Sequence, residues 1–111
     1  MLFHVVPEPE WTAGPEAPYR PASLASEGFV HCSPDEDTAL AIVDAHYRDV
    51  PGPLLLLLLD EALLTAEVRW EGSGDRRFPH VYGPLDRAAV VGVREIRRDA
   101  AGRVTGLAPR A

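Results

Sequence analysis

The sequence contains no lysine, so all eleven of its basic residues are arginines, and these stand against 17 carboxylates in 111 residues. The net charge of −6 opposes non-specific attachment to DNA, RNA or an anionic membrane, because such attachment depends on counterion release at a basic face. We therefore expect the partner to be a small molecule, a nucleotide or another metabolite, with neither DNA nor a membrane involved.

Cysteine and long apolar runs are also scarce. Cys32 is the only cysteine, which excludes an internal disulfide and a zinc site made of several cysteines. The longest apolar run, Leu54–Leu59, is far shorter than the roughly 18 residues that span a membrane, and no basic segment precedes an apolar one in the first residues. We expect a soluble, cytoplasmic protein that forms a single domain over residues 1–111.

Short runs of leucine, β-branched and aromatic residues predict the strands. The run 54–59 is continuously apolar, which is typical of a strand buried on both faces inside a sheet. Residues 72–77 are interpreted as a loop, and 78–85 as an extended segment whose two prolines prevent regular pairing. Residues 89–96 and 103–107 are predicted to form a terminal hairpin. The other strands are expected at 2–6, 29–33 and 68–72.

Capping residues and helical spacing predict the helices. Ser33 and Glu36 have the pattern of a capping box, and apolar residues then follow at helical spacing to about Asp49. Shorter helical turns are expected around Trp11 and at 22–28. Because no repeat or low-complexity linker divides the chain, we expect one α+β domain with a curved, mixed central sheet and flanking helices.

The stretch GFVHCSP, residues 28–34, carries a histidine, a cysteine and a serine in consecutive positions. Side chains alternate along a strand, so His31 and Ser33 share one face while Cys32 lies on the other. His31 and Cys32 therefore cannot act within the strand as base and nucleophile, and Cys32 is interpreted as a small buried hydrophobe. His31 is placed beside the N-terminus of the long helix, where an anion can bind.

The other histidines differ in their sequence context. His4 lies in the middle of the first strand, where it is either a structural residue with a hydrogen-bonding partner or a residue that lines a cleft. His80 lies in FPHVYGP, and we interpret it as functional, because prolines leave backbone groups free to face a ligand. His46, on the long helix, is assigned to packing or to the surface.

The segments FHVV, EGFVHCSP, VRWEG and FPHVYGPL, with an apolar LLLLL strand among them, resemble the domain-of-unknown-function family 952, a group of small bacterial proteins. The resemblance covers residues 1 to about 96 and leaves 97–111 as a terminal hairpin or tail. That family is grouped with the ADP-ribosyltransferase fold and is similar, strand by strand, to RNA 2′-phosphotransferases that use NAD. The resemblance implies a split, mixed sheet with an NAD cleft between its two halves.

The resemblance also implies catalytic roles for individual residues. His4 is similar to the first-strand histidine that hydrogen-bonds the ribose next to nicotinamide. His31 and Ser33 are similar to a second motif that lines the cleft where the helix begins. Either Glu71 or His80 represents the third motif, which in known transferases is usually a glutamate that binds the ribose.

Further residues are candidates for holding the nucleotide. Tyr19, Trp11 and Tyr82 can stack on a flat ring, and Arg20, Arg76 or Arg77 can hold a pyrophosphate through paired hydrogen bonds. Glu71 either stabilises the positive charge that develops on the ribose when nicotinamide leaves or is a solvated charge or an arginine's partner.

Three classes of function stay open. The resemblance favours an NAD-dependent transferase or glycohydrolase-like enzyme. The first alternative is a binding module that keeps the cleft without catalysis and takes a nucleotide or small metabolite. The second is a metal-dependent hydrolase built on His4, His31 and His80, which is the weakest because the chain has no closely spaced histidine pair.

Overall fold

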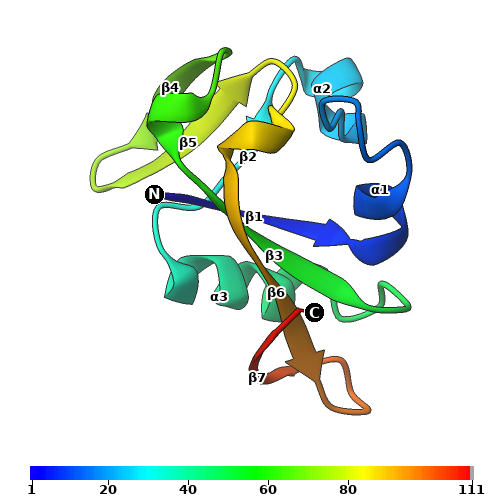
Figure 1. Ribbon diagram of the computed structural model, residues 1–111. Coiled ribbons are helices and arrows are strands. Elements are labelled where there is room, and N and C mark those ends of the chain that lie inside the picture. Colours follow the sequence, from blue (N-terminus) through cyan, green and yellow to red (C-terminus); the bar gives the residue numbers. More distant parts are fainter. Residues whose placement is uncertain (111) are drawn as a thin grey trace.

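Strand β3 (Leu54–Leu59) is an interior strand of the larger of two sheets in the computed structural model, which describes residues 1–110. It pairs with β1 (Leu2–Pro7) and β6 (Val90–Arg98), and β7 (Val104–Pro109) completes the order β1-β3-β6-β7 (Figure 1). Five of its six leucines are buried, so the interpretation of this run as a buried central strand is confirmed. The predicted terminal hairpin is confirmed as the antiparallel pair of β6 and β7.

The leucines of β3 contribute to two separate hydrophobic cores, because successive side chains of a strand point to opposite faces of the sheet. Leu55, Leu57 and Leu59 pack with residues of the smaller sheet, and Leu54 and Leu56 pack on the other face against the long helix. That explains why the run is continuously apolar rather than alternating, since both faces of this sheet are covered. Figure 1 shows the long helix α3 (Glu36–His46) on one side of β1 and the smaller sheet on the other.

The smaller sheet has the order β2-β5-β4, with β2 at Val30–His31, β4 at Glu67–Ser73 and β5 at Arg76–Tyr82. The prediction of a loop at 72–77 is wrong, because β4 and β5 form a hairpin whose register continues to Ser73 opposite Arg76. Gly74 supplies the turn at a positive φ of 61°.

The expectation that prolines prevent pairing in the 78–85 segment is also wrong for Pro79, which lies inside β5 opposite Trp70. The Pro79 carbonyl accepts a hydrogen bond from the Cys32 N–H at 3.1 Å, so this proline turns its backbone groups toward β2. The N–H that Pro79 lacks would point toward the segment that follows β2, where strand pairing has already ended. No hydrogen bond between β5 and β4 is therefore lost.

All strand pairs in both sheets are antiparallel over the described residues, so the expected mixed sheet is wrong. The molecule is a single α+β domain with two antiparallel sheets and few helices. The helical elements are α1 (Glu8–Thr12), α2 (Ala22–Glu27), α3 (Glu36–His46) and the 3₁₀ turns η1 (Glu61–Leu63) and η2 (Arg87–Ala89). No helix within residues 1–110 is long and apolar enough to span a membrane.

Helix α3 begins later than the sequence suggested. Its N-cap is Asp35, whose carboxylate accepts a hydrogen bond from the Thr38 N–H at 2.7 Å, so the assignment of Ser33 as the cap is wrong. Ser33 instead pairs its backbone with Phe3 through two hydrogen bonds of 2.7 and 2.9 Å. The helix also ends at His46, before the expected Asp49.

The predicted strand 29–33 is shorter than expected and connects the two sheets. Only Val30 and His31 pair with β5, and two residues later Ser33 forms a bridge to β1 of the larger sheet. The chain therefore crosses from one sheet to the other between His31 and Ser33, and both residues lie at the junction where a cavity opens.

Candidate functional site

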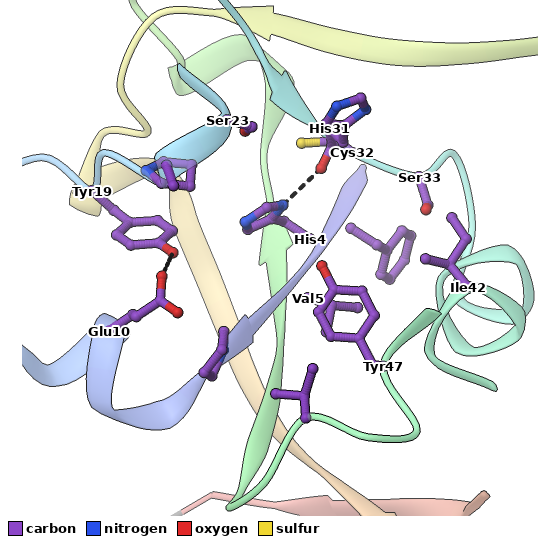
Figure 2. A pocket seen from close by; sticks show the side chains of 15 residues that line it. His4, Val5, Glu10, Tyr19, Ser23, His31, Cys32, Ser33, Ile42 and Tyr47 are labelled. Carbon is purple, nitrogen blue, oxygen red and sulfur yellow. Dashed lines mark hydrogen bonds between the residues drawn. The ribbon is translucent and has the colours of Figure 1, made fainter. Parts of the chain in front are cut away.

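A cavity of about 370 Å³ lies at this junction, between β1, the segment before α2 and the end of α3. Figure 2 shows its side chains, with His4 between Tyr19 and Tyr47 in the view. The polar residues on its lining are His4, Glu10, Tyr19, Ser23, His31, Ser33 and Tyr47.

His4 is the buried polar group of this cavity, and only 8% of the residue is exposed. Its Nδ1 lies 2.7 Å from the His31 carbonyl oxygen (Figure 2). Because a carbonyl only accepts, Nδ1 carries the proton and donates it. Burial is the main cause that lowers the pKa of His4 from 6.5 to about 4, so the ring is neutral at pH 7.

The second nitrogen of the His4 ring faces the cavity. Within residues 1–110, Nε2 of His4 has no hydrogen-bond partner, yet no unpartnered side-chain nitrogen or oxygen is sealed from solvent. Nε2 therefore has access to the cavity that His4 lines. Since Nδ1 holds the proton, Nε2 presents a lone pair that accepts a hydrogen bond. The same reasoning gives the Ser33 hydroxyl access to the cavity.

Tyr19 and Glu10 form the opposite wall. The Tyr19 hydroxyl donates to the Glu10 carboxylate at 3.1 Å, and the Tyr19 ring is buried against His4 and Trp11. Burial and the charge of Glu10 raise the pKa of Tyr19, and the same two causes raise the pKa of Tyr47. Sequence reasoning proposed Tyr19 but missed Glu10, since a glutamate in a short acidic turn gives no signal of its own.

Arg87, also missed, holds this wall in place. Its guanidinium donates to the carbonyl oxygens of Trp11 and Ala17, both at 2.8 Å, and its carbon Cζ lies 4.0 Å from the centre of the Trp11 ring. These contacts cross 70 or more residues of sequence, so no local pattern reveals them. Arg87 thereby fixes the loop that leads to Tyr19.

His31 serves the cavity through its backbone. Its carbonyl orients His4, while its imidazole Nε2 donates to the Glu27 carboxylate at 2.8 Å and its ring contacts Phe29 and His80. The sequence placed this ring beside an anion site at the helix start, but Asp35 already occupies the N-terminus of α3 with its own carboxylate.

A second cavity of about 470 Å³ shares a wall with the first and is lined by His31, Cys32, Ile42, His46, Tyr47, Phe78 and His80. His80 and Glu71, which the sequence treated as alternatives, are partners: Nδ1 of His80 donates to Glu71 at 2.8 Å. The Tyr82 hydroxyl donates to the same carboxylate oxygen. The hydrogen bonds from Tyr82 and His80 lower the pKa of Glu71, so it is ionised at neutral pH.

The model of a family described as a protein of unknown function, DUF952, matches residues 5–93. The chain belongs to the DUF952 family. Protein CC0527 from Caulobacter crescentus, solved by X-ray crystallography, is 27% identical, with a TM-score of 0.79 over 94% of this chain and 92% of that chain. A double mutant of CC0527 is 26% identical, with a TM-score of 0.78 over the same shares. No curated protein matches the chain.

The DUF952 match includes most of the site. It begins one residue after His4 and contains Glu10, Ser33, Glu71 and His80. Apart from Phe3 and His4, the residues that line the two cavities lie within the matched range.

The arginines proposed for a pyrophosphate lie outside both cavities of this DUF952 protein. Arg20 is exposed and borders a separate hollow with Glu10 and Arg87, and Arg77 is exposed on β5 opposite Gly72. Neither lines the wall next to His4 or His80. Within residues 1–110, no group of three histidine, cysteine or acidic side chains is arranged to hold a metal ion, so nothing in this part of the chain supports a three-histidine metal site.

Proposed function

We propose that this DUF952 protein binds a small metabolite, with NAD or another nucleotide as the specific candidate, in the cavity beside His4. The observation that carries the proposal is the neutral His4 ring, whose Nε2 lone pair opens into the cavity while its Nδ1 is fixed by the backbone. A histidine held in one tautomer by a second hydrogen bond is a prepared acceptor for a ligand hydroxyl or N–H group.

The size and shape of the cleft support a ligand of this class. A cavity of about 370 Å³ falls within the range of small-molecule sites, roughly 300 to 1,000 Å³. The second cavity shares His31, Cys32, Ile42 and Tyr47 with it, so the two cavities are adjacent along this common wall. A nucleotide has the required parts, since a ribose hydroxyl can donate to His4 and a base can pack on the apolar lining.

The experiment is a calorimetric titration with NAD, ADP-ribose and nicotinamide. His4→Asn is the informative variant, because its amide can still donate to the His31 carbonyl while the Nε2 acceptor is gone. We expect binding about 10- to 100-fold weaker in His4→Asn, the cost of leaving a ligand donor unpaired. The exposed His46→Asn is the control for the first cavity. Equal affinities for wild type and His4→Asn, or no binding of any of the three compounds, would contradict the proposal.

A second candidate function, an NAD-dependent transferase or glycohydrolase, is favoured by the hydrogen bond between Glu71 and His80. Cleavage of the bond between ribose and nicotinamide builds positive charge on the sugar, which a nearby carboxylate stabilises. Water or an acceptor hydroxyl then attacks the ribose carbon, nicotinamide leaves with the bonding electrons, and His80 can take the proton of the attacking group. Release of nicotinamide, measured by chromatography, should stop in Glu71→Gln. If the wild type binds NAD but releases no nicotinamide, the enzymatic candidate is contradicted and the protein is a non-catalytic binding module.

A further inference from the structure

The polar groups around His4 share one hydrogen-bonding character. Nε2 of His4 offers a lone pair, and the Glu10 carboxylate can only accept. The Tyr19 hydroxyl donates its hydrogen bond to Glu10, so the Tyr19 oxygen can only accept a further hydrogen bond. The hydroxyls of Ser23, Ser33 and Tyr47 can donate or accept and so do not alter this balance. The lining therefore favours a ligand group that donates hydrogen bonds.

The charge of the lining points the same way. Glu10 is the only acidic residue among those that line the cavity, and no arginine is among them. Within residues 1–110, no basic side chain lies within ion-pair distance of Glu10, and Arg20 and Arg87 border a separate hollow with it rather than this cavity. His31 is the other histidine that lines the cavity besides the neutral His4. Its imidazole is directed to Glu27 and His80.

Two aromatic rings add to this negative environment. Tyr19 and Tyr47 both line the cavity, and burial, followed by the charge of Glu10, raises the pKa of each, while the charge of Arg87 opposes the shift of Tyr19. Both tyrosines are therefore un-ionised rings at neutral pH. The face of such a ring attracts a cation, and the attraction adds to that of a carboxylate.

We propose that the cavity beside His4 selects a planar organic cation that donates hydrogen bonds, of the pyridinium or amidinium type, and that Glu10 determines this specificity. The inference rests on the proposed function, because it requires that the cavity binds a small molecule. It also assigns the site a polarity: a phosphate or carboxylate group of a ligand lies outside this cavity, because the lining offers an anion no basic partner.

The test uses three ligands of one shape and different charge: benzamidinium, benzamide and benzoate. Calorimetric or NMR titration of the wild type should rank their affinities in that order, with the cation bound about 3- to 10-fold more tightly than benzamide, as expected for a carboxylate and ring faces open to solvent. Glu10→Gln should reduce this ratio to below about 2. Glu16→Gln, at an exposed position in the following loop, is the matched control and should keep the wild-type ratio.

The outcomes separate the inference from the proposed function. If benzoate binds as tightly as benzamidinium, or if Glu10→Gln keeps the preference for the cation, the inference is overturned. If NAD binds beside His4 but none of the three ligands does, the inference fails and the proposed function stands. If neither NAD nor any of the three binds, both fail. Thermal unfolding of Glu10→Gln shows that its fold is intact, which is expected for an exposed side chain.

Discussion

The two cavities meet at residues 31 and 32 but hold their histidines in opposite ways. His4, which lines the first cavity, is buried, donates a hydrogen bond to a backbone carbonyl and has no acidic partner. His31 and His80, which line the second cavity, each donate to a carboxylate, and their rings lie 5.4 Å apart. A neutral histidine with a fixed lone pair suits binding, whereas an imidazole backed by a carboxylate suits proton transfer.

This contrast follows from the sheets that carry the histidines. The larger sheet is covered on both faces, so a polar side chain on β1 loses its water and must be neutral. The smaller sheet covers the core with only one face, through Val30 and Val81. Its other face carries His80, Glu71 and Tyr82, which are only partly buried and are joined by hydrogen bonds to Glu71.

The largest effect is expected on the free energy of unfolding, when a side chain of the larger sheet is compared with one of the smaller sheet. Leu57→Ala, in the fully buried core of β3, should lower the free energy of unfolding by about 2 to 5 kcal/mol, because it removes packed methyl groups and leaves a cavity. Trp70→Ala, on β4 with 43% of the residue exposed, should cost far less. Urea denaturation measures both. Similar costs for the two variants would show that the larger sheet is not the dominant core.

The next effect tests the neutral state of His4. Its folded pKa of about 4 lies below the unfolded value of 6.5, so the unfolded chain binds a proton first as the pH falls. Stability should be full above pH 6.5 and should fall by up to about 3 kcal/mol between pH 6.5 and 4. Urea midpoints across this window should show that His4→Asn lacks this component, while His46→Asn keeps it. A wild type with the same pH profile as His4→Asn would mean that His4 is not buried as a neutral ring.

A smaller effect concerns the helix start next to the cavity. Asp35→Ala should lower the free energy of unfolding by about 1 kcal/mol, because the Thr38 N–H loses its acceptor. Ser33→Ala should have less effect on stability, since its pairing with Phe3 uses only backbone atoms. Denaturant unfolding of the two variants compares them directly, and a greater loss in Ser33→Ala would restore Ser33 as the cap.

The last prediction concerns the accessibility of Cys32, which belongs to the wall shared by both cavities. Only 3% of Cys32 is exposed, and burial raises the pKa of its thiol to about 12. Iodoacetamide should therefore label it slowly at pH 8 and quickly only after unfolding. Rapid labelling of the folded protein that is blocked by ligand would instead make Cys32 a reactive residue of the site.

Sequence patterns were sufficient where the decisive contacts are local. The six leucines of β3 and the terminal hairpin were predicted, since apolar runs and turn residues act over a few positions. The helix start was misassigned because Ser33 and Asp35 are both good caps, and only the bridge to Phe3 decides between them. Pro79 was misread because its tolerance depends on where β2 ends.

The candidate site was partly predictable for the same reason. His4, His31, Ser33 and Tyr19 were proposed from the sequence, and all four line one cavity. His80 was assigned to the same site but lines the adjoining cavity, and its partnership with Glu71 depends on the hairpin register of β4 and β5. Arg87 acts through contacts with residues 70 or more positions away, and Glu10 through a single hydrogen bond to Tyr19, and no periodicity in the sequence indicates either contact. The role of each residue in binding stays a prediction.

The most direct test of the account is an NMR titration of the ¹⁵N-labelled wild-type protein with NAD, followed residue by residue. The account predicts that the largest chemical-shift changes surround the first cavity, at residues 3–5, Ser33 and Tyr47, and that His4→Asn suppresses them. Changes confined to the β4–β5 hairpin, or no changes at millimolar NAD, would contradict the claim that the pocket of His4 is the binding site.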